Sequence, residues 1–252
     1  MKSPELVPKG LSMIKAVIFD LDNTLVDFMA MKGQAIEAAI GSMIDAGLGL
    51  SREEVRERID AIYKERGIEF QNVFDELLYD IFQKVDYKIL SAGIIAYRRA
   101  REAALVPYPH VHLTLIGLLK RGLKLAVVSD APAREAWLRL CSLGFHHLFE
   151  CVVTFGDTGE RKPSPGPFRR ALHQLSVRPE EALMVGDWPE RDVVGASQLG
   201  IRTAFARYGD TFGTVESHAD FDLRDISELL AIVDRLNDGS TTRPSTVKAS
   251  EL

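Results

Sequence analysis

A short apolar segment that ends in two aspartates is the strongest constraint in this sequence. Residues 16–19, Ala-Val-Ile-Phe, are followed by Asp20, a leucine and Asp22. A fully apolar run with β-branched residues is typical of a buried parallel strand, and α/β folds bind ligands at the carboxyl ends of such strands. If the chain stays extended there, the two carboxylates point to different sides and can take different roles. An ordinary strand followed by an Asx-type turn is the alternative.

Composition disfavours several classes of partner. The 252 residues fit one large domain or a core with an inserted module, and a hydrophobic content of 46% is enough to form a core. The net charge of −5, without a block of like charges, disfavours nucleic acid and membrane surfaces. We find no apolar run near the ~20 residues that span a bilayer and no apolar signal segment in residues 1–12. Cys141 and Cys151 lack metal-site spacing and are expected to be buried free thiols in a cytoplasmic protein.

Residues 28–105 show helical periodicity. Apolar residues recur at i, i+3 and i+4 over 35–44, and Ser51 precedes a second helix with acids in its first turn. Residues 70–85 and 88–105 are expected to form two more helices. Residues 107–109, Pro-Tyr-Pro, then form a stiff connection. We therefore expect a four-helix module inserted into an α/β domain.

The rest of the chain alternates between strand and helix patterns. We expect strands at 123–128, 151–154, 182–185 and 202–206, and helices at 134–143, 167–174, 192–199 and 226–236. Such alternation indicates right-handed βαβ units and a parallel sheet covered on both faces. The expected division is a core of 13–27 and 106–237, a helical module of 28–105 and a mobile tail of 238–252.

Polar residues follow two further expected strands and occupy one loop between them. Ser129 and Asp130 follow a strand, where a hydroxyl and nearby backbone N–H groups suit an anionic oxygen, although both are also common helix caps. Lys162 precedes a proline, so a rigid loop presents its ammonium; a surface lysine is the alternative. Asp187 and Asp192 follow another strand and offer the oxygen ligands that suit Mg²⁺.

Taken together and in this order, these residues resemble the haloacid dehalogenase superfamily, in its phosphatase branch with a helical cap after the first core strand. The match extends over about residues 14–210 and consists of Asp20-x-Asp22-x-Thr24, Ser129, Lys162-Pro163, and Gly186-Asp187 followed by Asp192. The resemblance implies a Rossmann-like α/β core with strand order 5-4-1-2-3. Two positions depart from the family pattern, because Asn23 and His110 stand where relatives often have glycine.

The resemblance also implies roles for these residues. Asp20 would be the nucleophile and Asp22 the general acid and base. Ser129 and Lys162 would hold the phosphoryl group, with Thr24 and Asp130 also in the substrate site. Mg²⁺ would be bound by Asp20, Asp22, Asp187 and Asp192. The expected reaction is hydrolysis of a small phosphate ester through an aspartyl-phosphate, which splits one difficult displacement into two easier ones.

Three other functions remain open at this point. A 2-haloacid dehalogenase shares the nucleophile but typically lacks the second aspartate and the metal, so Asp22 and Asp187 favour phosphoryl transfer. A phosphomutase uses both aspartates and differs in what accepts the phosphoryl group. A non-catalytic binding protein on the same fold would not need all of these charged residues. The sequence does not identify the substrate or the oligomeric state.

Overall fold

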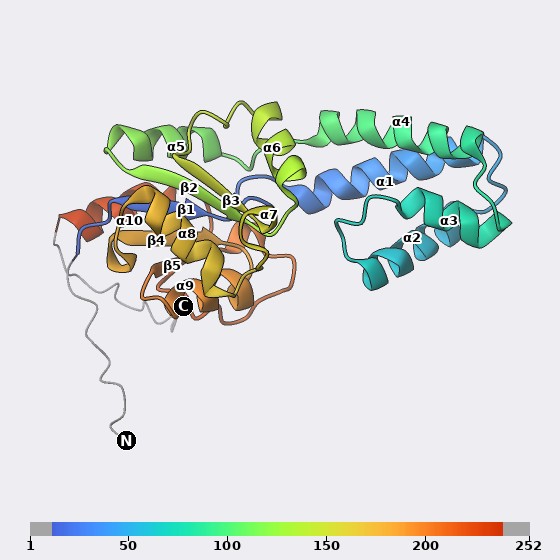
Figure 1. Ribbon diagram of the computed structural model, residues 1–252. Coiled ribbons are helices and arrows are strands. Elements are labelled where there is room, and N and C mark those ends of the chain that lie inside the picture. The colour runs from blue at the N-terminus through green and yellow to red at the C-terminus, as the bar shows by residue number, and fades with distance from the viewer. Residues whose placement is uncertain (1–11, 239–252) are drawn as a thin grey trace, which may run out of the picture.

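The computed structural model describes residues 12–238 as a parallel sheet covered by helices, with a helical bundle beside it (Figure 1). The strands are β1 (Ala16–Phe19), β2 (Lys124–Ser129), β3 (Cys151–Thr154), β4 (Ala182–Gly186), β5 (Arg202–Ala206) and β6 (Phe221–Leu223). The helices are α1 (Phe28–Asp45), α2 (Arg52–Arg66), α3 (Val73–Phe82), α4 (Tyr87–Ala104), α5 (Val111–Lys120), α6 (Ala133–Ser142), α7 (Phe155–Thr158), α8 (Pro165–Leu175), α9 (Val194–Ser197) and α10 (Glu228–Asn237). Residues 239–252 of the expected tail lie outside the described residues.

The strand order across the sheet is β3-β2-β1-β4-β5-β6, and all neighbours are parallel. This confirms the fold class and the expected order of the first five strands. Strand β6, which pairs with β5 at the sheet edge, is additional to that order. Its three residues, Phe-Asp-Leu, are too few to show a strand pattern, because strands in globular proteins usually have about five or six residues.

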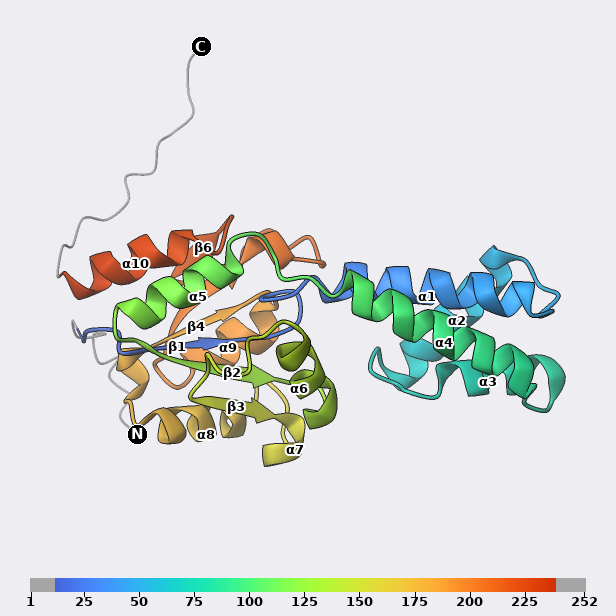
Figure 2. The ribbon, with the colours of Figure 1, turned by 90° about the horizontal axis from the view of Figure 1, so that it is seen from above.

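Helices cover both faces of the sheet. The central strand β1 is therefore apolar on both of its faces. Val17 and Phe19 pack into one apolar cluster with residues of α5, α6 and α10, whereas Ala16 and Ile18 pack into another with residues of α8 and α9. Figure 2 shows α5 and α10 on one side of the sheet and α8 on the other. Alternate residues of a strand point to opposite faces of the sheet. A central strand between two helical layers is therefore a continuous apolar run in the sequence.

Two helical regions differ from the sequence prediction. No helix is predicted from the sequence at the position of α5. The N-cap residue of this helix, His110, makes no side-chain capping hydrogen bond, and Gly117 interrupts the helical pattern of the sequence. Gly117 lies against Leu230 of α10, where an added Cβ would be 2.9 Å from that side chain. The helix expected at 192–199 begins instead with a π-helical turn, Pro189–Val193, that continues into the short α9. Both cysteines are free, as expected, but neither is buried: Cys141 is exposed and Cys151 is half-buried.

Helices α1 to α4 form the bundle, which lies beyond the carboxyl ends of the strands (Figures 1 and 2). The bundle has its own apolar cluster, separate from those of the sheet. Helices α1 and α4 approach closely, because a Cβ at Gly93 would lie 2.7 Å from Met43 Cγ. None of the helices within residues 12–238 is long and apolar enough to cross a bilayer.

The two connections between sheet and bundle lie side by side. Val26 forms an antiparallel bridge with Pro107, and the Tyr108 N–H donates to the Leu25 carbonyl at 3.1 Å. Both positions that depart from the family's glycines, Asn23 and His110, have a φ near +60°. Asn and His visit the left-handed region more readily than most residues, so each departure keeps the backbone conformation that glycine would favour.

Candidate active site

The candidate site lies at the carboxyl ends of the central strands. Asp20 follows β1, Ser129 ends β2 and Asp187 follows β4, so the parallel register brings the three together. They line a cavity of about 620 Å³. The opposite wall comes from the bundle, through the start of α1 and through residues 66–70, at the end of α2 and in the loop before α3. This arrangement places the bundle over the polar strand ends.

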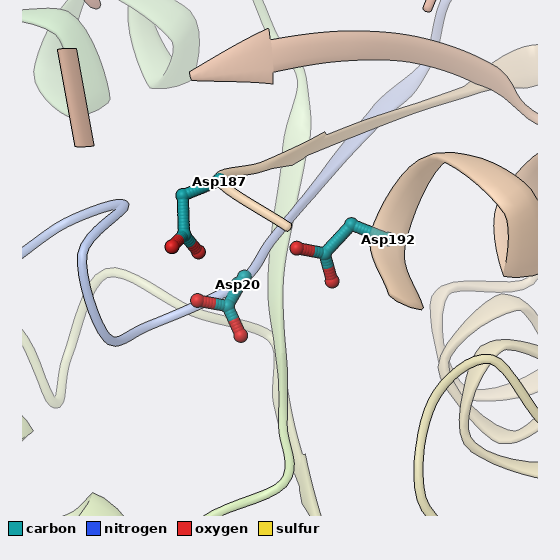
Figure 3. A group of neighbouring side chains, drawn as sticks. All are labelled: Asp20, Asp187 and Asp192. Carbon is teal, nitrogen blue, oxygen red and sulfur yellow. The ribbon is translucent and has the colours of Figure 1, made fainter. Parts of the chain in front are cut away.

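Three buried carboxylates gather at the base of the cavity. Oxygens of Asp20, Asp187 and Asp192 all lie within 4.8 Å of one another, and the residues are 7%, 4% and 1% exposed. Figure 3 shows the three carboxylates grouped beside one another. Asp192 reaches this position only because residue 186 is glycine: a Cβ there would lie 2.2 Å from Asp192 Oδ2. The Trp188 N–H also donates to that oxygen at 3.1 Å.

Lys162 supplies a cation to this cluster. Its ammonium donates to Asp20 Oδ1 and lies 2.7 Å from Asp192 Oδ1. Burial alone would lower the pKa of Lys162, but the two carboxylates outweigh burial and raise it. Burial raises the pKa of Asp20 to about 7, with Lys162 opposing the rise. Burial, together with repulsion from Asp20 and Asp192, raises the pKa of Asp187 to about 9.

The donor set of this cluster fits a divalent cation. With all three carboxylates ionised, the single ammonium of Lys162 leaves two negative charges uncompensated in a buried site. Carboxylate oxygens are the ligands that Mg²⁺ and similar hard cations prefer. A cation bound by Asp20, Asp187 and Asp192 would compensate the repulsion that adds to burial in raising the pKa values of Asp20 and Asp187.

Asp22 has different partners from Asp20, although only one residue separates them. Its Oδ2 accepts a hydrogen bond from Arg139 at 2.8 Å, and Arg139 also donates to Glu69 at 2.7 Å. Its Oδ1 is buried and makes no hydrogen bond to any described residue. Burial raises the pKa of Asp22 to about 6, with Arg139 opposing the rise. The structure therefore does not bring the Asp22 carboxylate into the acidic cluster, and a metal-binding role for Asp22 stays a prediction.

Ser129 and Asp130 both line the cavity, but their side chains have different hydrogen-bond partners. Ser129 lines it, and its hydroxyl accepts from the Ala131 N–H at 3.2 Å. Asp130 also lines it, but its two oxygens accept from the Lys162 N–H at 2.9 Å and from Arg191 at 3.1 Å. Asp130 therefore holds the loop that carries Lys162.

Thr24 lies behind the site rather than in it. It is fully buried and is not among the described residues that line the cavity, so its expected place among the substrate contacts stays a prediction. Its hydroxyl donates to Asp187 Oδ1 at 3.4 Å, and its carbonyl accepts from the Tyr208 hydroxyl at 2.8 Å. These contacts indicate that Thr24 supports Asp187.

Three contributors to this site carry no signal in the sequence. Arg139, which contacts Asp22, and Glu69, which contacts Arg139, lie in segments whose pattern is typical of ordinary surface charges. Gly209 packs against the loop after Asp22, where an added Cβ would lie 1.6 Å from the Asn23 carbonyl oxygen. Glycine is common in loops of every kind, so only this close approach shows why position 209 lacks a side chain.

Comparison with known proteins establishes the family. The model of the family described as haloacid dehalogenase-like hydrolase matches residues 14–200. The chain belongs to this family. This haloacid dehalogenase-like hydrolase is 35% identical to a glyceraldehyde 3-phosphate phosphatase of Methanocaldococcus jannaschii and 38% identical to one of Methanopyrus kandleri, each match covering 89% of this chain and 99% of the relative.

A solved structure agrees with these relatives. A HAD phosphatase from Thermococcus onnurineus is similar with a TM-score of 0.66 and 28% identity, over 87% of this chain and 98% of that one. The expectation of a phosphoric monoester hydrolase of the haloacid dehalogenase family is confirmed.

Proposed function

We propose that this phosphatase is Mg²⁺-dependent and hydrolyses small phosphomonoesters through an aspartyl-phosphate formed on Asp20. The observation that carries the proposal is the separation of the two aspartates. Asp20 lies in a buried cluster with Lys162 and two further carboxylates, whereas Asp22 lies apart with one oxygen free of hydrogen bonds to the described residues. A nucleophile and a proton-transfer group need such different surroundings.

The metal would be held by Asp20, Asp187 and Asp192, the residues whose oxygens already converge. Two unit charges 4.8 Å apart repel by roughly 3.5 kcal/mol at an effective dielectric of about 20. The bound cation would compensate this repulsion and the charge of an incoming phosphate. A metal role for the Asp22 carboxylate receives no such support, because that carboxylate is paired with Arg139.

The proposed chemistry has two displacements. A carboxylate oxygen of Asp20 attacks phosphorus while the bond from phosphorus to the ester oxygen breaks, and Asp22 donates a proton to the departing oxygen. Asp22 then takes a proton from water, and the water oxygen attacks phosphorus and releases Asp20. Ser129 and Lys162 contact the phosphoryl oxygens throughout, and their buried positions keep them fixed for this task.

The helical bundle, residues 28–105, is proposed to act as a cap over a core of 13–27 and 106–237. Residues 66–70 of the bundle line the same cavity as the catalytic groups, so they can contact the part of the substrate that leaves. The adjacent connections near Val26 and Pro107 offer a place about which the cap can move. The substrate preference would then follow the cap.

Glyceraldehyde 3-phosphate is the first substrate to test, because the Methanocaldococcus and Methanopyrus relatives carry that activity in their names. A small phosphate ester and two free thiols also fit a cytoplasmic enzyme.

The test is a panel of phosphoglycolate, sugar phosphates, nucleotides, pyridoxal phosphate and glyceraldehyde 3-phosphate, assayed for phosphate release with Mg²⁺ and with EDTA. We expect Mg²⁺-dependent release and an acid-stable phosphoprotein that is lost in Asp20→Asn. Asp80→Asn, at an exposed aspartate of α3, is the matched control and should retain activity. Normal turnover by a folded Asp20→Asn protein would refute the proposal. Phosphoryl transfer to a second hydroxyl would indicate a mutase, halide release a dehalogenase, and no turnover at all a binding protein.

A further inference from the structure

Arg139 of α6 joins three parts of the molecule that are distant in sequence. Its guanidinium donates to Asp22, 117 residues away, at 2.8 Å and to Glu69, 70 residues away, at 2.7 Å. It also lies 4.5 Å from the centre of the Phe28 ring, at the first residue of α1. Arg139 is only 6% exposed. One buried side chain therefore contacts the proposed acid and base, the α2–α3 segment of the cap and the start of the cap.

The geometry of these contacts fixes the orientation of Asp22. A guanidinium is planar and donates in fixed directions, so its two nitrogens orient two carboxylates at once. Here one nitrogen contacts Asp22 Oδ2, and Glu69 engages the other. Asp22 lines the cavity, and its Oδ1 makes no hydrogen bond to the described residues. The pairing thus leaves Asp22 Oδ1, which is buried, without a hydrogen-bond partner among the described residues.

We propose that Arg139 is a positioning residue that makes proton transfer by Asp22 depend on the α2–α3 segment of the cap. This inference rests on the proposed function, because it assumes that Asp22 protonates the leaving group. When Glu69 is in place, the guanidinium is held by two carboxylates and by the Phe28 ring, and Asp22 is held with it. When the segment withdraws, Arg139 loses one of its two carboxylates and can rotate, so Asp22 is no longer held in one orientation.

A second ion pair between cap and core provides a matched control. Arg101 of α4 pairs with Glu135 of α6 at 3.1 Å, so it also bridges the bundle and the core. Its partner is a helix residue of the core, whereas Arg139 contacts Asp22 itself. Loss of Arg101 tests a cap–core ion pair that makes no contact with Asp22, whereas loss of Arg139 or Glu69 tests the connection to Asp22.

The experiment compares kcat and KM for two esters, 4-nitrophenyl phosphate with a good leaving group and an alkyl phosphate with a poor one. General acid catalysis contributes about 10²–10⁴-fold and matters most for the poor leaving group. We expect Arg139→Met to lower kcat on the alkyl ester by about 100-fold or more and on the aryl ester by less than about tenfold, with Arg139→Lys recovering part of the loss. Glu69→Gln should show a smaller loss of the same kind, and Arg101→Gln should leave the ratio of the two rates unchanged.

A double variant tests whether Glu69 acts through Arg139. Glu69→Gln should have no further effect on the alkyl ester in the Arg139→Met background, because the connection is already broken. Additive losses, equal losses on both esters, or the same selective loss in Arg101→Gln would overturn the inference. If Arg139→Met does not fold, Glu69→Gln decides the matter, since its side chain is 25% exposed. An active Asp20→Asn protein would instead show that the proposed function itself is wrong.

Discussion

Removal of one charge from the acidic cluster is expected to stabilise the metal-free protein while it abolishes metal binding. The change is Asp187→Asn, which is isosteric. Thr24 donates to Asp187 Oδ1 at 3.4 Å, and an amide oxygen can accept the same hydrogen bond. The variant therefore differs from the wild type mainly in charge.

The magnitude follows from the raised pKa of Asp187, about 9 against an ordinary value of 3.8. A carboxyl group whose pKa rises on folding contributes stability that is present below the unfolded value and is lost as pH increases toward the folded value. At pH 7 the loss is about 4 kcal/mol, from about 1.36 kcal/mol per pKa unit. Burial is the larger cause of the raised pKa, and repulsion from Asp20 and Asp192 adds to it. Water in the cavity weakens both terms, so we expect a gain of at least about 1 kcal/mol.

The assay is thermal unfolding of wild type and variant between pH 4.5 and 8.5, in EDTA and in Mg²⁺. In EDTA at pH 8 the variant should melt at least about 2 °C higher, and the difference should shrink toward pH 4.5. Mg²⁺ at 100 times its Kd should stabilise the wild type by about 2.7 kcal/mol and the variant much less. Asp80→Asn should show neither effect. A variant less stable than the wild type at pH 8 in EDTA would refute the reasoning.

Three further predictions concern the site and the cap. Asp22→Asn should lower kcat on an alkyl phosphate by about 10²–10⁴-fold but much less on 4-nitrophenyl phosphate; equal losses would remove Asp22 from the acid role. Gly186→Ala should displace Asp192 and weaken Mg²⁺ binding at least about tenfold in a calorimetric titration, while Gly33→Ala, which meets no atom within 4 Å, should not. Replacing residues 30–104 by a short linker should leave slow, unselective cleavage of activated esters if circular dichroism shows a folded core; retention of the full protein's substrate ranking would contradict a specificity role for the cap.

The sequence alone determined the strands and the residues that follow them. Ala16–Phe19 is apolar on both faces because helices cover both sides of a central strand, and this pattern is local. Parallel strands align their carboxyl ends at one edge, so residues after different strands meet there without further information. Asp20, Ser129 and Asp187 therefore come together as expected from the chain itself. The short edge strand β6 carried too few residues for such a pattern.

Tertiary structure alone decided which charged groups pair. Asp22 belongs with Arg139 and Glu69 rather than with the acidic cluster, and Arg139 lies 117 residues from Asp22 and 70 from Glu69 along the chain. No periodicity of α6 distinguishes Arg139 from a solvated arginine, because its burial depends on how α6 packs against the cap. Thr24 is likewise hidden by packing against Tyr208 and Asp187. A local sequence pattern indicates whether a strand or helix face is buried. A pairing between side chains that are distant in sequence forms only when tertiary packing brings their elements into contact.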